Sequence, residues 1–405
     1  MKYIFWLSLM LWASFFSQAD NRLIKQDAKA EITYVENTRE AGFRTGSERM
    51  EVYLPLLEGK KVGVLTNQTG MVGEVHLVDT LLAVGVELVR IYSPEHGFRG
   101  QAEAGEKVDH QTDQRTGLPI VSLYGSNRKP KPEQLEDIDI MLFDLQDVGV
   151  RFYTYTSTLH YLLEACSDAG IPVMVLDRPN PNGRIVDGNI PDLKKPSFVC
   201  MHPVPILHGL TIGEYAQMLV GEAWLNTTGV PNLTVIACEQ YLPHKPYELP
   251  VAPSPNLANQ NAIYLYASLC LFEGTKMSIG RGTDHPFEVF GHPEFEGPFE
   301  FTPRSIPGFA LNPKHQDKLC RGRSLRGEGE RVYISSQLNM SYLMDSYQFF
   351  KNDSDFFIPF FDVLAGGTEL RLQMEAGLSV EAIRDSWKLG LNEFESLSKS
   401  YYLYP

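Results

Sequence analysis

The sequence predicts an α/β protein in which a Rossmann-like, parallel-sheet N-terminal domain is followed by a smaller α+β C-terminal domain, with a cleft between them. Three observations lead to this fold class. From about residue 51, short apolar runs alternate with helical patterns. The short runs are almost continuously apolar, which is typical of parallel strands covered on both faces. A proline-rich segment, 241–260, then breaks the alternation and marks the domain boundary.

The N-terminal domain is predicted to span residues 51–240. Its strands are rich in β-branched and aliphatic residues, and its helices carry apolar side chains at helical spacing. The predicted strands are 61–66, 87–92, 138–145, 172–177 and 233–237. The predicted helices are 77–84, 155–169 and 211–224.

The C-terminal domain, residues 241–405, has a mixed pattern. Ser379 is a good N-cap for a helix that places Ile383, Trp387 and Leu391 on one face. The run 331–335 has the β-branched and aromatic character of a strand. Residues 20–50 are polar, and we expect little regular structure there.

The first 19 residues predict export. Lys2 precedes an apolar run that is short for a membrane span, and Ser17-Gln18-Ala19 has small residues at its first and third positions. These are the marks of a secretory signal peptide, 1–19, with an uncleaved N-terminal anchor as the alternative. No other long uncharged apolar segment follows. We therefore expect an exported, periplasmic protein with no membrane anchor after cleavage.

Charge and motifs exclude several classes. The formal net charge is −14, and loss of Lys2 makes it one unit more negative, which disfavours nucleic acid as a partner. The five cysteines are scattered without a C-x-x-C pair, so neither a zinc knuckle nor a redox pair is indicated. The stretch "GVLTNQTG" at 63–70 lacks the spacing of a phosphate loop or a dinucleotide site. No cofactor is expected.

Three predicted strands each end in an acid and an arginine. These pairs are Glu95 and Arg99, Asp147 and Arg151, and Asp177 and Arg178. A single pair would be an ordinary ion pair, but carboxyl ends of parallel strands share one edge, where open α/β sheets bind ligands. We therefore expect these side chains, with His96 beside Glu95, to gather in the crevice.

Two further segments could contribute. In helix 155–169, Ser157, His160, Tyr161 and Glu164 share one stripe, which is either a solvated face or a wall that points a second carboxyl toward Glu95. The segment 271–291 is dense in charge and glycine and suggests a second wall carrying Glu273, Arg281 and Asp284. Asp284 and His285 could also suggest a metal, but neighbouring residues do not easily ligate together and no third ligand is evident.

Several long motifs resemble one known family. They are "LTNQTG", "SPEHGFRG", "TGLPIVSLYG", "FDLQDVGVRFYTYTST", "LDRPNPNG", "HGLTIGEYA", "APSPN" and "LFEGTKMSIGRGTDHPFE". In this order, from about Val62 to the C-terminus, they resemble the NamZ-type exo-β-N-acetylmuramidases. The resemblance implies an exported glycosidase that releases N-acetylmuramic acid from the non-reducing end of peptidoglycan fragments, with saccharides or muropeptides as its ligands.

The resemblance also implies site residues. Two glutamates are proposed as the family's catalytic pair, and that of "SPEHG" corresponds to Glu95. Glu164 is the favoured second carboxyl, while Glu273 stays open. Glycoside cleavage needs an acid for the leaving oxygen and support for an oxocarbenium-like transition state. Retaining, inverting and substrate-assisted routes all remain open.

Substrate-binding roles follow from the chemistry of the sugar. Its lactyl carboxylate suits an arginine, for which Arg99, Arg151, Arg178 and Arg281 are candidates, with Arg178 favoured because the two prolines of "DRPNP" limit backbone motion there. The polar side chains suited to bind sugar hydroxyls are those of Asn67, Gln68, Asp177 and Asn180. An aromatic ring that stacks on the pyranose face could come from Tyr153 or Tyr155. The competing functions are a non-catalytic muropeptide-binding protein and a metal-dependent amidase or esterase. The absence of G-x-S-x-G weighs against a serine esterase.

Overall fold

The N-terminal half is built on one eight-stranded sheet. The computed structural model describes residues 31–35, 42–95, 97–99, 111–191, 194 and 196–405. The strand order is β1-β12-β9-β8-β2-β5-β7-β6, with every neighbouring pair parallel except β7 and β6. The strands are β1 (Glu31–Val35), β2 (Lys61–Thr66), β5 (Glu87–Ser93), β6 (Gln111–Thr112), β7 (Pro119–Ser122), β8 (Ile140–Asp144), β9 (Val173–Leu176) and β12 (Asn232–Ile236).

The strand order has a switch point between β2 and β8. Counted along the chain from β2, the strands β7-β5-β2-β8-β9-β12 follow the order 3-2-1-4-5-6 of a Rossmann fold. Thr66 pairs with Asp144 at the carboxyl ends of β2 and β8. In such sheets the chain leaves these two strands in opposite directions and opens a crevice at their carboxyl edge.

Period-two alternation explains the two cores. Val62 and Val64 of β2 pack on one face with α2 (Met50–Leu57) and α3 (Leu77–Ala83). Leu65 packs on the other face with α4 (Tyr155–Ala169) and α5 (Ile212–Gly221). Both faces are thus buried, which is why the strands read as nearly continuous apolar runs.

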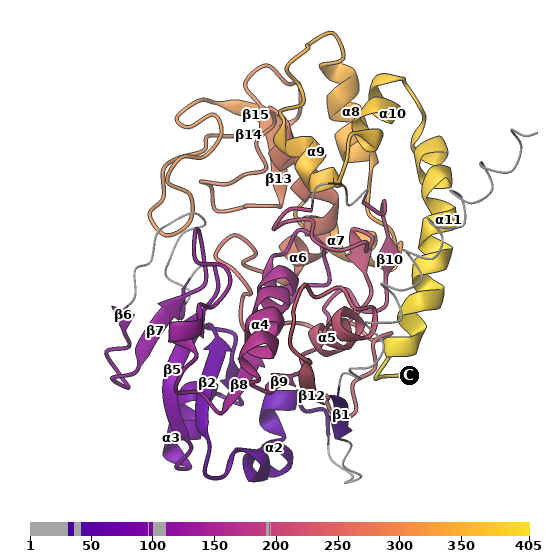
Figure 1. Ribbon diagram of the computed structural model, residues 1–405. Helices are drawn as coiled ribbons and strands as arrows, with labels where there is room; N and C mark the ends of the chain where they lie inside the picture. The colour runs from indigo at the N-terminus through magenta and orange to yellow at the C-terminus, as the bar shows by residue number, and fades with distance from the viewer. Residues whose placement is uncertain (1–30, 36–41, 96, 100–110, 192–193, 195) are drawn as a thin grey trace, which may run out of the picture.

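The C-terminal half combines a small antiparallel sheet with helices. Its strands β13 (Val289–His292), β15 (Cys320–Ser324) and β14 (Phe299–Phe301) lie side by side in that order. In Figure 1 they occupy the upper part of the molecule, above the large sheet. The helices are α6 (Gln260–Leu269), α7 (Gly329–Ile334), α8 (Ser341–Phe349), α9 (Phe360–Ala365), α10 (Glu369–Glu375) and α11 (Val380–Ser398).

Short elements complete the chain. Two small antiparallel pairs are β3 (Met71–Val72) with β4 (Val75–His76), and β10 (Val186–Asp187) with β11 (Leu207–His208). The 3-10 turns are η1 (Gly46–Glu48), η2 (Pro132–Gln134), η3 (Cys270–Gly274) and η4 (Lys399–Tyr401).

The structure confirms the α/β fold class and corrects two local predictions. The run 331–335 belongs mostly to helix α7, not to a strand, and α7 packs along α6 with Val332 buried in the core. Residues Glu31–Val35, expected to lack regular structure, pair with β12 along the edge of the sheet. The predicted signal peptide, 1–19, lies outside the described residues.

All five cysteines are buried as free thiols. Among the helices in the described part of the chain, none combines the length and apolar character needed to cross a bilayer.

Candidate active site

A cavity of about 550 Å³ is lined by both halves of the chain. The N-terminal half contributes Glu95, Tyr124, Arg128, Phe152, Tyr153, Thr154, Tyr155, Phe198 and Val199. The C-terminal half contributes residues between Ser254 and Leu364, among them Asn256, Tyr266, Glu273, Arg281 and Phe287. This volume is in the usual range for small-molecule sites.

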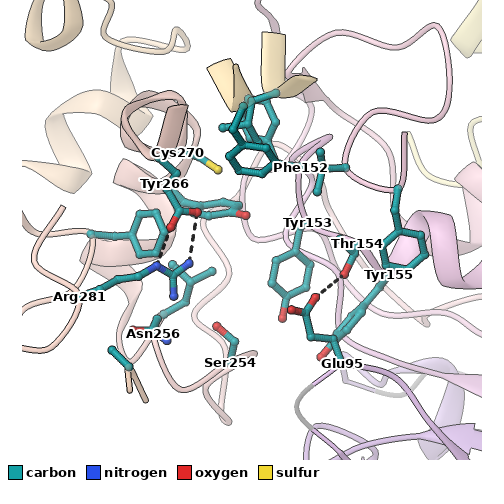
Figure 2. A pocket seen from close by; sticks show the side chains of 18 of the residues that line it. Glu95, Phe152, Tyr153, Thr154, Tyr155, Ser254, Asn256, Tyr266, Cys270 and Arg281 are labelled. Atoms are coloured by element: carbon teal, nitrogen blue, oxygen red, sulfur yellow. Dashed lines mark hydrogen bonds and ion pairs between the residues drawn. The ribbon is translucent and has the colours of Figure 1, made fainter. Parts of the chain in front are cut away.

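Glu95 reaches the cavity because β5 ends two residues before it. The side chain is half-buried, and its Oε2 accepts a hydrogen bond from Thr154 Oγ1 at 3.1 Å. Thr154 is the N-cap position of α4, so the carboxyl is held beside the start of a helix. Figure 2 shows Glu95 on one side of the cavity with Tyr153 and Tyr155, and Arg281 on the other side.

Aromatic rings form much of the wall. Tyr153 packs edge-on against Tyr155, at a centroid distance of 4.7 Å, and against Tyr266, at 6.1 Å. Tyr153 Oη donates to the Pro253 carbonyl at 2.7 Å, and Asn67 Nδ2 donates to Tyr155 Oη at 2.6 Å. Burial raises the pKa of both tyrosines, so their hydroxyls stay neutral.

A tight turn after β8 sets the position of residues 152–155. Gly149 has a φ of +74°, and a Cβ there would lie 2.2 Å from Asn180 Oδ1, so glycine is required. Its N–H donates to Asp147 Oδ2 at 2.6 Å. Burial raises the pKa of Asp147 to about 7. Asp147 and Asn180 therefore build the turn and do not line the cavity.

The opposite wall carries an ion pair. Arg281 Nε and Nη2 donate to the two oxygens of Glu273, at 2.6 and 3.2 Å. Burial opposes the charge of Arg281, but Glu273 raises its pKa above the ordinary value. Lys314 Nζ donates to the carbonyls of Phe272 and Glu273 at the end of η3, and burial lowers its pKa to about 8.

The structure thus brings Glu95, Tyr153, Glu273 and Arg281 of the predicted set into one cavity. Glu164 is not among the lining residues. It lies nine residues beyond Tyr155 in α4, about 13 Å along the helix axis at ~1.5 Å per residue. The expectation that it points toward Glu95 is therefore corrected.

The contacts of Glu164 are internal. Its oxygens contact His160 Nε2 at 3.0 Å and Lys129 Nζ at 3.1 Å, and accept from the Asn226 N–H at 2.7 Å. Burial opposes its ionisation, but the hydrogen bonds of His160 and Asn226 lower its pKa below the ordinary value.

Three of the four candidate arginines also bind elsewhere. Arg178 is buried, with Nε and Nη2 at 2.6 and 2.9 Å from the carboxylate of Asp144. Arg151 is buried and donates to backbone carbonyls, including that of Val204 at 3.0 Å. Arg99 forms a bidentate pair with Asp113, at 3.0 and 2.9 Å, and not with Glu95. Arg151 and Arg178 are thus buried with their partners, Arg99 is bound to Asp113 at 34% exposure, and none of the three lines the cavity.

The remaining polar candidates lie outside the cavity as well. Asp177 is buried and accepts from Thr211 Oγ1 at 2.7 Å. Gln68 Nε2 donates to the carbonyls of Ala252 and Pro253, both at 3.2 Å. Asn67 supports Tyr155 from behind, and Asp284 is exposed. His96 lies outside the described residues.

Sequence reasoning missed Arg128, Tyr266 and Asn256, which line the cavity. Arg128 sits in "GSNRKPKP", a polar loop with no feature that separates a site residue from a solvated one. Tyr266 has the helical spacing of an ordinary core residue. Asn256 belongs to the "APSPN" motif, which was a signal for it. Within the described residues, no group of three or more His, Cys, Asp or Glu side chains could hold a metal ion.

Comparison with known proteins identifies the family. Residues 62–261 match the family model described as exo-beta-N-acetylmuramidase NamZ, N-terminal, and residues 264–404 match its C-terminal counterpart. The chain belongs to the NamZ family. It is therefore a member of a glycosidase family, as its motifs predicted.

Relatives agree over most of the chain. The peptidoglycan beta-N-acetylmuramidase NamZ of Bacillus subtilis (strain 168) is 37% identical over 371 residues, covering 87% of this chain and 89% of that protein. Two crystal structures of DUF1343 family proteins from Bacteroides fragilis NCTC 9343 are similar. One has a TM-score of 0.83 and 43% identity, and the other 0.75 and 29%. Each covers 90% of this chain and 99% of its own.

Proposed function

We propose that this protein is an exo-acting glycosidase that releases N-acetylmuramic acid from the non-reducing end of peptidoglycan fragments. The observation that carries the proposal is Glu95, a half-buried carboxyl in an aromatic cavity of a NamZ family member. The Bacillus subtilis relative is named as a peptidoglycan β-N-acetylmuramidase, which supports the same substrate class here.

Glu95 is assigned the role of general acid. A protonated carboxyl placed at the glycosidic oxygen gives its proton to the leaving group as the bond to the anomeric carbon breaks. Thr154 Oγ1 donates to Oε2, which leaves Oε1 as the oxygen that carries the proton in this assignment. The neutral hydroxyls of Tyr153 and Tyr155 and the aromatic rings around them provide a surface for a pyranose.

Glu273 is assigned a supporting role. Both of its oxygens accept hydrogen bonds from Arg281, so it is not a free nucleophile. A carboxylate has about four lone-pair sites, so two remain to accept from a water or a sugar hydroxyl. We propose that Glu273 orients such a group opposite Glu95.

The compartment is part of the proposal. A signal peptide at 1–19 would bring the enzyme to the periplasm, where peptidoglycan fragments are. Mature protein recovered from that compartment should begin at Asp20. Recovery of membrane-bound protein that retains Met1, by intact-mass measurement, would contradict export with cleavage.

Hydrolysis of a chromogenic muraminide tests the activity. We expect release of nitrophenol from 4-nitrophenyl β-N-acetylmuraminide, and release of N-acetylmuramic acid from disaccharide fragments that carry it at the non-reducing end. Activity that survives EDTA fits carboxylate catalysis, whereas activity that EDTA abolishes would indicate a metal-dependent hydrolase. Tight binding of the fragments without turnover would indicate a binding protein.

A further inference from the structure

The cavity holds two guanidinium groups that differ in their charge balance. That of Arg281 is paired in a bidentate manner with Glu273. That of Arg128 is exposed at the cavity wall, where its Cζ lies 4.3 Å from the centroid of the Phe198 ring. Across the residues that the structure describes, no carboxylate forms an ion pair with Arg128. Among the described residues of the wall, Arg128 is therefore a cation whose charge no carboxylate partner neutralises.

Phe198 forms a fixed platform for that cation. The ring of Tyr161 is stacked against that of Phe198, at a centroid distance of 6.2 Å and an interplanar angle of 11°. The Phe198 carbonyl also accepts from Ser157 Oγ at 2.7 Å. A guanidinium over an aromatic face keeps its N–H donors free in its own plane. Arg128 can thus stack on Phe198 and still bind an anion with its fork.

The loop that carries Arg128 is anchored on both sides. Asn127 Nδ2 donates to the Ser122 carbonyl at 2.8 Å. Lys129 Nζ donates to Glu164 at 3.1 Å and to Asp168 at 3.3 Å. Fixing the backbone before binding lowers the entropic cost of using the side chain between them. Glu164 therefore contributes to the site through Lys129, as an anchor.

We propose that Arg128, stacked on Phe198, binds the lactyl carboxylate that distinguishes N-acetylmuramic acid from N-acetylglucosamine. The proposal rests on the proposed function. Neither carboxyl of the cavity wall, Glu95 or Glu273, offers a cation to a substrate carboxylate, and Arg281 is already paired with Glu273. Arg99, Arg151 and Arg178 lie outside the cavity with partners of their own. A planar fork matches a carboxylate, and a site built for it rejects the sugar that lacks it.

The proposal is tested by removing the guanidinium from the enzyme and the negative charge from the substrate, separately and together, and comparing the effects. The rate constant kcat/KM is measured for wild type and Arg128→Met on 4-nitrophenyl β-N-acetylmuraminide and on its lactyl methyl ester. We expect the variant to lose about 10- to 100-fold on the free acid, the range for a charge-assisted hydrogen bond, and less than about threefold on the ester. Arg128→Lys should recover part of the loss, because the charge remains and the fork does not.

Arg326→Met is a matched control. Arg326 is also an exposed arginine near a phenylalanine ring, 5.7 Å from that of Phe299, but it does not line the cavity. The Arg326→Met substitution should leave kcat/KM unchanged for both substrates. Equal losses on acid and ester for Arg128→Met, or no loss on the acid, would overturn the assignment.

Binding separates this proposal from the proposed function. Calorimetry of free N-acetylmuramic acid and N-acetylglucosamine needs no turnover. Wild type should prefer the acidic sugar, and Arg128→Met should lose that preference. If wild type prefers N-acetylmuramic acid but hydrolyses no muraminide, the proposed function is contradicted and the role of Arg128 in recognition is supported. If wild type shows no preference, or Arg128→Met keeps it, the recognition assignment is wrong.

Discussion

Replacing Arg178 with methionine should damage the fold and not the choice of substrate. The guanidinium is 5% exposed and the carboxylate of Asp144 is fully buried, with N–O distances of 2.6 and 2.9 Å. In the described residues, Arg178 is the only side chain that donates to Asp144. Arg178 Nη2 also contacts Ser47 Oγ and the Met71 carbonyl, both at 3.1 Å, and the latter contact is partly redundant because Ser47 Oγ donates to the same carbonyl at 2.9 Å.

The magnitude follows from the carboxylate left behind. Breaking a buried ion pair by removing one partner costs about 3–5 kcal/mol, because the other charge stays buried and unpaired. With a urea m value of about 3–4 kcal/mol/M for a chain of this size, the unfolding midpoint falls by about 1 M. The double variant Arg178→Met/Asp144→Leu removes both charges and should recover most of that loss.

Two measurements on the same samples decide the matter. Urea unfolding followed by tryptophan fluorescence gives stability, and kcat/KM per folded molecule on the muraminide and on its lactyl methyl ester gives discrimination. We expect a lower midpoint and an acid-to-ester ratio within about twofold of wild type. A variant of normal stability that loses activity on the free acid alone would refute this reasoning.

Three further predictions concern carboxyls. Glu164→Gln should leave kcat within a few-fold of wild type, while KM rises modestly and stability falls. Because the folded pKa of Glu164 is lowered, the stability it contributes is full above the unfolded pKa and is lost in acid, so chemical unfolding should show a smaller difference between variant and wild type at pH 3–4 than at pH 7. A hundredfold loss of kcat would restore a catalytic role for Glu164. Asp147 has a folded pKa of about 7, so between about pH 4 and pH 7 only the unfolded chain loses the proton. As pH rises through that window, Asp147→Asn should gain stability relative to wild type, on the order of 4 kcal/mol at most. A difference in unfolding free energy that does not change with pH would contradict the raised pKa. Glu273→Gln should lower kcat on the muraminide by about 10- to 100-fold, less than the loss of a general acid, and an unchanged kcat would remove Glu273 from the reaction.

The sequence carried enough information for the sheet because its signals are local. The apolar runs of β2 and β8 are buried on both faces, so they stand out without knowledge of their neighbours. Ser379 predicted the start of α11 because its side chain accepts from the Ala382 N–H, a contact three residues away. In contrast, β1 depends on pairing with β12, some 200 residues later, and a short polar-flanked strand gives no sign of such a partner.

The site was only partly predictable for a related reason. A strand end places a charged residue at the ligand-binding edge of the sheet, but the sequence does not show whether another buried side chain will pair with that residue. Arg178 pairs with Asp144 and Arg99 pairs with Asp113, and neither side chain lines the cavity. Arg128 was missed because only the folded chain stacks it on the Phe198 ring, and no carboxylate among the described residues forms an ion pair with it.

The most direct test of the account is the effect of Glu95→Gln on leaving groups of different acidity. The amide keeps the shape and the acceptor for Thr154 but cannot give a proton to the glycosidic oxygen. On an unactivated disaccharide, kcat should fall by at least about 10²-fold, while a 2,4-dinitrophenyl muraminide, whose leaving group needs no proton, should retain most of its rate of bond cleavage. Retention of more than about a tenth of wild-type kcat on the disaccharide, with the native circular dichroism spectrum preserved, would remove Glu95 from the acid role.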